Sequence, residues 1–274
     1  MDVVFGLLSA VANAIGGELS KGLTLRYPAR QLIGPLFLLN ALLLAPLAPF
    51  QDWTWSPTIV ALHLISVGLL ILTSLAIWDL YDHGSAAATV TAQSISPLPA
   101  ALAVAVLLPG TLEPVQVVAA LIVVLAVLIG LSDSFGALGR GRTMVTVLVA
   151  AAGTGLVTVV GRLLADLDVG VVEAYVVRTS LAALVFYLFV PPRDVPLRAL
   201  PGMLPRAAFI TAHFVLILIG VQDGNPAVVQ TAVATAPLFS IGFEIARSGR
   251  RPSGRLLLAA SLAVIGVAAI LLAG

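Results

Sequence analysis

The stretch G-S-A-A-A-T-V-T-A-Q-S-I-S-P-L at residues 84–98 returns in altered form as G-N-P-A-V-V-Q-T-A-V-A-T-A-P-L at residues 224–238. At one constant spacing the same residue occurs in both stretches at Gly84/Gly224, Ala87/Ala227, Thr91/Thr231, Ala92/Ala232, Pro97/Pro237 and Leu98/Leu238. Weak internal similarity in a hydrophobic chain is typical of duplicated membrane carriers, whose binding site lies where the two repeats meet near the bilayer midplane. The repeat therefore predicts two related halves, residues 1–137 and 138–274.

Composition places the chain in the membrane. Of its 274 residues 60% are hydrophobic and only 10% are charged, and the mean hydropathy is +1.11. A soluble globule of this composition would lack the polar surface to cover itself. The chain has no cysteine, which excludes disulfides and thiolate metal sites, and its net charge of +1 favours no nucleic-acid partner.

Hydrophobic segments of about 20 residues, the length needed to cross a bilayer as a helix, follow one another along the chain. We predict an all-α integral membrane protein with ten transmembrane helices, arranged as two inverted five-helix repeats. The first segment lacks a basic start and a small-residue cleavage site, so we count it as a span rather than a signal peptide. The spans are expected near residues 3–20, 31–50, 57–79, 84–108, 115–132, 143–163, 169–191, 204–221, 225–245 and 254–273.

Basic residues set the expected orientation. Of the fourteen Lys and Arg residues, all but Arg162 and Arg178 fall in connections that follow odd-numbered spans. Short loops rich in Lys and Arg stay in the cytoplasm, so both termini are expected outside. The connection after span two has no Lys or Arg while its counterpart after span seven has Arg193, Arg198 and Arg206, as inversion of the second repeat requires.

These features resemble the drug/metabolite transporter superfamily in its ten-span form, built from two EamA-like repeats. The resemblance rests on the two Pro-Leu spans, on Arg178 in span seven, and on the turn at residues 249–253 before a final Leu/Ala/Gly-rich span. It implies a multi-pass carrier in a bacterial inner membrane, an exporter of amino acids, related metabolites or drug-like compounds. Family members usually keep both termini in the cytoplasm, opposite to the orientation that the charges predict.

The first span also resembles the small multidrug resistance branch of that superfamily. It reads A-N-A-I-G at residues 12–16, followed by Lys21, where that branch has Ala-Glu. Asn13 thus stands in place of the proton-coupling glutamate, and an amide cannot exchange a proton near neutral pH. We expect Asn13 to contact substrate without coupling transport to protons.

Polar side chains inside the spans are the candidate site residues, because they are costly in hydrocarbon unless they face a cavity or one another. Thr89, Gln93 and Ser96 share one face of the fourth span. The ninth span carries Gln230, Thr231 and Thr235. These residues either line a substrate site with Asn13 or act as packing contacts between helices.

Ionisable groups within the spans allow two readings each. Arg178 lies too deep in its span to reach the interface easily and either pairs with protein groups or binds an anionic group of the substrate. Glu173, His63 and His213 are either interfacial or packing residues, or the groups that couple transport to protons. No metal or other cofactor is expected.

Enzyme motifs are missing from the sequence. It contains no H-E-x-x-H, phosphate-binding loop or G-x-S-x-G elbow, and without nucleotide-binding motifs transport must be secondary or facilitated. The expected partners are a small-molecule substrate and membrane lipid, and the chain could act as a monomer or homodimer. A membrane enzyme or a scaffold remains the alternative, although neither explains the inverted duplication.

Overall fold

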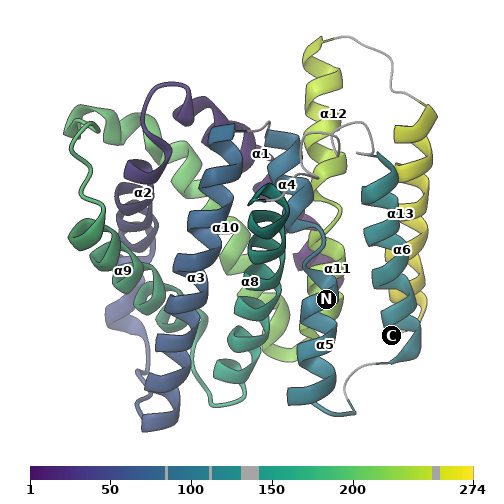
Figure 1. The fold of residues 1–274 in the computed structure, drawn as a ribbon. Coiled ribbons are helices and arrows are strands. Elements are labelled where there is room, and N and C mark those ends of the chain that lie inside the picture. Colours follow the sequence, from purple (N-terminus) through teal and green to yellow (C-terminus); the bar gives the residue numbers. More distant parts are fainter. Residues whose placement is uncertain (84–85, 111–112, 131–141, 249–253, 274) are drawn as a thin grey trace.

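The computed structural model describes residues 1–274 except 84–85, 111–112, 131–141, 249–253 and 274, and the described part consists of helices and the turns between them (Figure 1). The predicted turn at 249–253 lies outside the described residues. The helices are α1 (Asp2–Thr24), α2 (Ala29–Leu44), η1 (Ala45–Phe50), α3 (Pro57–His83), α4 (Ala86–Gln93), α5 (Pro97–Leu107), α6 (Pro114–Gly130), α8 (Arg142–Ala165), α9 (Val171–Phe189), η2 (Leu197–Ala199), α10 (Leu200–Asp223), α11 (Pro226–Val233), α12 (Ala236–Ser248) and α13 (Gly254–Ala273).

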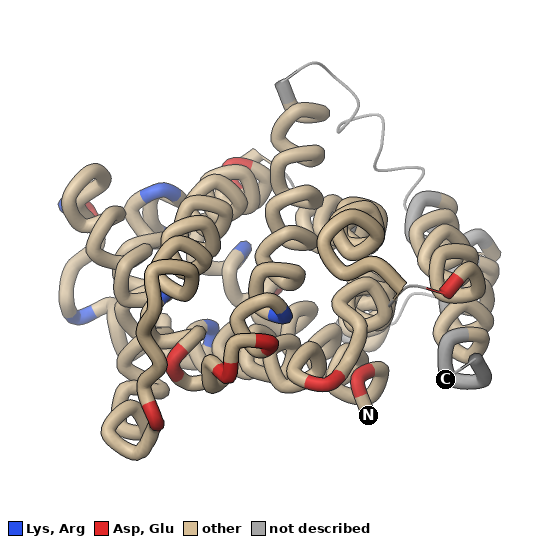
Figure 2. Tube along the Cα trace, turned by 90° about the horizontal axis from the view of Figure 1, so that it is seen from below, with Lys and Arg blue, Asp and Glu red and all other residues tan. Residues whose placement is uncertain are grey.

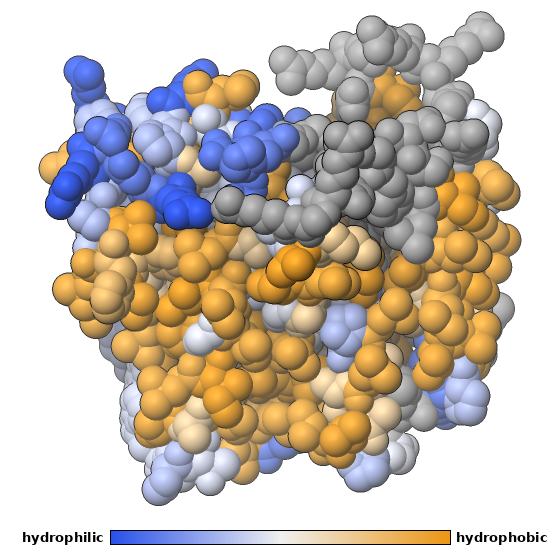
Figure 3. All heavy atoms as spheres, viewed as in Figure 1, coloured by the Kyte–Doolittle hydropathy of each residue, from blue (hydrophilic) through white to orange (hydrophobic). Residues whose placement is uncertain are grey.

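The face of the bundle drawn in Figure 3 is largely apolar. Seven segments of the described chain are long and apolar enough to cross a membrane, and α5 and α6 add shorter apolar helices. In the space-filling view, hydrophobic residues cover the middle of the molecule, while hydrophilic ones gather at its upper and lower ends (Figure 3). This all-helical, multi-pass architecture confirms the predicted fold class, whereas the count of ten spans stays a prediction.

Two of the predicted spans are interrupted. The segment expected as one helix over 84–108 is divided into α4 and α5, and the segment over 225–245 into α11 and α12. Because proline has no N–H, Pro97 and Pro237 cannot donate to the carbonyl groups four residues before them. The Gln93 carbonyl instead accepts from the amide of Ser96 at 2.9 Å, in a tighter turn. The two breaks fall at corresponding positions of the repeated sequence.

The broken helices lie against each other in opposite directions. In Figure 1, α4 and α5 descend while α11 and α12 ascend, and the contacts pair α4 with α12 and α5 with α11. Ser96 in the first break donates to Gln230 Oε1 of α11 at 2.8 Å. The two copies of the repeated sequence therefore meet at the middle of the bundle, in the antiparallel relation that an inverted repeat predicts.

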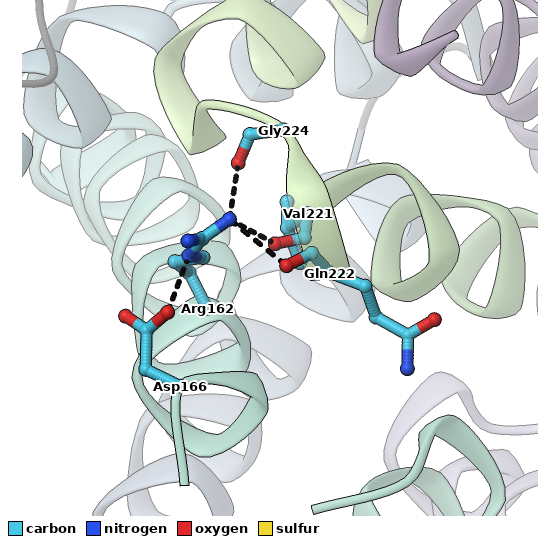
Figure 4. A network of polar contacts seen from close by, with 5 residues as sticks. All are labelled: Arg162, Asp166, Val221, Gln222 and Gly224. Carbon is cyan, nitrogen blue, oxygen red and sulfur yellow. Dashed lines mark hydrogen bonds and ion pairs between the residues drawn. The ribbon is translucent and has the colours of Figure 1, made fainter. Parts of the chain in front are cut away.

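Arg162, one of the two cations outside the basic connections, joins the C-terminal end of α8 to the C-terminal end of α10. Its Nη1 donates to the carbonyl oxygens of Val221, Gln222 and Gly224 at 2.9 to 3.3 Å, and its Nε pairs with Asp166 at 2.9 Å (Figure 4). Helix C-termini leave carbonyl groups unpaired and attract cations. Arg162 thus fixes the turn from α10 into α11.

Charged positions lie mainly at the ends of the helices. Viewed along the bundle, most Asp and Glu positions follow one side of the outline, while Lys and Arg positions occur both at its edge and inside it (Figure 2). Two of the interior cations are Arg178 and Arg206, which are 3% and 8% exposed. The charge pattern counts Arg206 with the connection that precedes the span at 204–221; in the structure α10 begins at Leu200 and carries Arg206 into the bundle.

Candidate functional site

A cavity lies at mid-depth between α1, α2, α3, α4, α8 and α10. It leaves about 50 Å³ for the centres of water molecules, which is room for a few of them. Its wall is partly aromatic, with Phe37 from α2, Trp78 from α3 and Phe214 from α10. A mostly apolar wall with a few polar groups is the usual character of a small-molecule site, here in a contracted form.

Amide groups occupy the middle of the cavity wall. Asn13 of α1 donates from Nδ2 to Gln93 Oε1 of α4 at 3.4 Å, and both residues are buried. When the Asn40 amide of α2 is turned over, the orientation that its neighbours favour, its nitrogen donates to the carbonyl oxygens of Leu36 and Ala207, each at 3.2 Å. The long Asn13 to Gln93 bond is weak, so these two amides can exchange it for contacts with a solute.

A histidine on α10 also faces this space. His213 is 2% exposed, and its Nδ1 lies 2.7 Å from Ser9 Oγ of α1. The same serine hydroxyl is 3.1 Å from the His213 carbonyl oxygen. Ser9 therefore fixes the ring between α1 and α10, which favours the packing role of the two roles expected for His213.

Arg206 lies at the end of the cavity that faces the basic connections. Its Nε donates to Ser20 Oγ of α1 at 3.0 Å, and its Cζ lies 5.2 Å from the centroid of the Trp78 ring. Within the described residues it has no ion pair, and no Asp or Glu lines the cavity. Neither are three His, Asp or Glu side chains of the described chain grouped so as to hold a metal ion.

Gln230 lies outside this cavity. It is 0% exposed and bridges the two halves, accepting from Ser96 Oγ at 2.8 Å and donating to Thr158 Oγ1 of α8. Thr231 and Thr235 donate to the backbone carbonyl oxygens of Ala227 and Ala232, both at 2.7 Å. Of the two roles that the sequence left open, the geometry of these residues favours packing.

Arg178 lies behind an aromatic layer. Its Cζ is 5.5 Å from the Tyr175 ring centroid and 5.3 Å from that of Phe214, and its buried Nη2 makes no hydrogen bond to the described chain. Phe214 also lines the cavity, so it stands between the cavity and Arg178. The structure therefore does not bring Arg178 into direct contact with the space that Asn13 and Gln93 line.

Glu173 and His63 are more deeply buried than the sequence suggests. We expected Glu173 at an interface, but it is 0% exposed and its Oε2 accepts from the amide and hydroxyl of Thr54, at 3.2 and 3.3 Å. His63 is 2% exposed, and neither ring nitrogen has a partner among the described residues. The bend of the chain before α3 brings Thr54 over the start of α9 and buries Glu173.

The cavity contains polar residues that sequence reasoning missed. Arg206, Asn40 and Tyr81 line it, together with hydroxyl groups on α3 and α8. Arg206 could have been found, because a helix begun at Leu200 places it about 9 Å inside at 1.5 Å per residue. No pattern in the sequence distinguishes Asn40 from a packing residue, since its neighbours in the chain are uniformly apolar.

The geometry defines a class of protein: a multi-pass helical membrane protein whose central cavity has a mostly apolar wall with a few polar groups and lies beside two antiparallel broken helices. Residues 141–272 match the model of the EamA-like transporter family. The second half of the chain thus contains an EamA-like domain of the drug/metabolite transporter superfamily, and this match indicates a membrane transporter of that type. The resemblance of the first span to the small multidrug resistance branch stays a prediction.

Solved structures share the fold. One of them, described as "Crystal structure of protein", superposes with a TM-score of 0.76 at 20% sequence identity and covers 99% of this chain and 96% of that chain. At that identity the likeness concerns the fold alone. No curated protein sequence matches this chain.

Proposed function

We propose that the protein is a secondary or facilitative exporter of small organic solutes that works by alternating access around the central cavity. Two five-helix repeats, residues 1–137 and 138–274, would rock against each other, with α4–α5 and α11–α12 as their contact. The observation that carries this proposal is the cavity itself. It brings Asn13 of α1, Gln93 of α4 and Thr154 of α8 together at the depth where inverted-repeat carriers bind their substrates.

The small volume of the cavity fits an occluded state of the carrier, between the inward-open and outward-open conformations. Its space admits a few water molecules, so an organic solute requires the helices around it to separate. Thr54 covers Glu173 at one end of the bundle, and Gln31 donates to Asp194 at 2.7 Å at the other. We expect the contact at each end to break when that side of the carrier opens. Glu173, His63 and His213 are the candidate coupling groups if protons drive transport.

A single cysteine can test the cavity, because the chain has none of its own. In Thr154→Cys, a small uncharged thiol reagent should abolish saturable solute uptake by proteoliposomes, since the added group fills the cavity. The solute is chosen by comparing metabolites exported by overexpressing and control cells. Leu148→Cys on the same helix, 51% exposed on the apolar surface, is the matched control and should retain uptake. Equal uptake by both modified variants would place the transport route elsewhere.

Orientation in a bacterial inner membrane, the location we propose, is tested by labelling. Arg198→Cys lies at the basic end and should resist an impermeant thiol reagent in intact cells, because basic loops stay in the cytoplasm. Asp52→Cys at the opposite end should be labelled rapidly. The reverse pattern would place both termini in the cytoplasm, as is usual for this superfamily.

Asn13→Ala separates binding from coupling. The substitution removes an amide that can exchange its hydrogen bond to Gln93 for one to the solute, so we expect the apparent affinity for the exported solute to fall several-fold. Because an amide does not titrate, the pH dependence of uptake should keep its shape. Loss of a proton-driven component in this variant would contradict the assignment of Asn13 as a contact residue.

A further inference from the structure

Arg206 presents unused hydrogen-bond donors to the cavity. Its Nε is held by Ser20 Oγ at 3.0 Å, whereas its two terminal nitrogens make no hydrogen bond to the described chain. An arginine in a membrane protein normally pairs with a carboxylate or with carbonyl groups, because an unpaired charge is costly there. The terminal nitrogens of a guanidinium group also have the fixed spacing that matches the two oxygens of a carboxylate.

The charge of Arg206 is not compensated inside the cavity. None of the described residues that line it is Asp or Glu, so this wall offers no carboxylate to pair with an ammonium group. Arg206 is also on the side of the bundle where the basic connections gather, among them Arg26, Arg30 and Arg198.

The rest of the cavity suits an apolar body. Trp78 stacks beneath the Arg206 guanidinium group, and Phe37 and Phe214 line the wall. The amides of Asn13 and Gln93 supply a few neutral hydrogen-bonding groups farther along. Positive charge at one end and aromatic surface beside it are complementary to a molecule with one anionic group and a ring or short aliphatic chain.

We propose that the substrates are small organic monoanions, carboxylates with an aromatic or apolar body, and that Arg206 binds the carboxylate. This inference rests on the proposed transport function and names its substrate class. It assigns the anion contact to Arg206 rather than to Arg178, because Phe214 separates Arg178 from the cavity. It also excludes organic cations as preferred substrates.

Trp78 provides a direct readout, since it contacts Arg206. The chain has three tryptophans, so a Trp53→Phe/Trp55→Phe variant of the full-length protein leaves Trp78 as its single fluorophore. In lipid nanodiscs at pH 7 this variant is titrated with 3-phenylpropionate, 3-phenylpropionamide and 3-phenylpropylamine, which share a body and differ in charge. We expect a saturable change of fluorescence with the acid, and affinities at least about tenfold lower for the amide and the amine.

Substitutions then locate the contact. Arg206→Gln should lower the affinity for the acid about tenfold or more while changing that for the amide less than about threefold, so that the two converge. Arg206→Lys should retain part of the preference. Arg178→Gln is the matched control, a second buried arginine without an ion pair in the described chain, and should keep the full preference. If Arg206→Gln does not fold, Ser74→Asp, which places a carboxylate in the cavity wall, should remove the preference with Arg206 intact.

Each outcome is decisive. Equal or tighter binding of the amine or amide, no saturable response to the acid, or an undiminished preference in Arg206→Gln or Ser74→Asp overturns the anion assignment. Loss of the preference in Arg178→Gln alone would move the contact to Arg178 and also overturn it. A different experiment tests the proposed function. Uptake by modified Thr154→Cys, compared with modified Leu148→Cys, decides whether the cavity is the transport route, whatever the binding preference is.

Discussion

Replacement of Gly155 by valine should lower the melting temperature of the purified protein by about 10 °C, the equivalent of about 3 kcal/mol of overpacking. Gly155 lies on α8 where it crosses the first broken helix. A Cβ at this position would lie 2.5 Å from the Ser96 carbonyl oxygen and 3.0 Å from the Ala100 amide nitrogen. Both are backbone atoms, so no side chain can turn aside to relieve the contact.

The control for this prediction is Gly68→Ala on α3, where an added Cβ meets nothing within 4 Å. Alanine favours a helix over glycine, so the melting temperature should stay the same or rise. Thermal unfolding followed by circular dichroism in the same detergent compares the variants. A drop of similar size for both glycines would mean that α8 does not depend on close approach to the break between α4 and α5.

Leucine in place of Gln230 should mainly lower stability, whereas leucine in place of Gln93 should mainly lower transport. Gln230→Leu leaves Ser96 Oγ without its partner inside the bundle, so we expect a loss of about 1 to 3 kcal/mol in stability with little change in substrate affinity. Gln93→Leu removes a group that faces the cavity and should weaken transport about tenfold with a smaller effect on stability. From the sequence alone, loss of binding would be predicted for both.

Uptake kinetics and thermal unfolding, measured on both variants, separate these effects. The contrast needs both readouts, because a poorly folded protein also transports slowly. If Gln230→Leu unfolds at the normal temperature but loses affinity, Gln230 is a substrate contact that acts in another conformation of the carrier. If Gln93→Leu changes only stability, the cavity is not where the solute binds.

The apolar runs and the Pro and Gly residues between them predict the helices well, because both signals depend on residues that are close together in the sequence. Apolar runs of bilayer length predict the helices, and Pro97 and Pro237 indicate where two of them deviate. The full breaks at these positions were not predicted, because a proline alone fits either a kinked helix or two separate ones. Which outcome occurs depends on what packs against the freed carbonyl groups, and the sequence does not contain that information.

Candidate site residues were harder to predict than helices. Polarity within a span selects buried groups, and Asn13 and Gln93 do line the cavity. The same criterion also selects Gln230, which is equally buried but bonded on both sides by hydroxyl groups of other helices. Arg206 was missed for another reason: it was counted with the basic residues of the connection after the seventh span, although it lies inside the expected span 204–221.

The absence of acidic residues from the described cavity wall has an electrical consequence. If Glu173, His63 and His213 carry no proton back, a carrier that moves a monoanion through this site transfers net charge in every cycle. In a cell whose interior is negative, each 100 mV contributes about 2.3 kcal/mol to the outward movement of one negative charge. That is a gradient of about fiftyfold. The voltage of the membrane alone would then suffice to drive export, and reversing the potential in vesicles would reverse the direction of net flow.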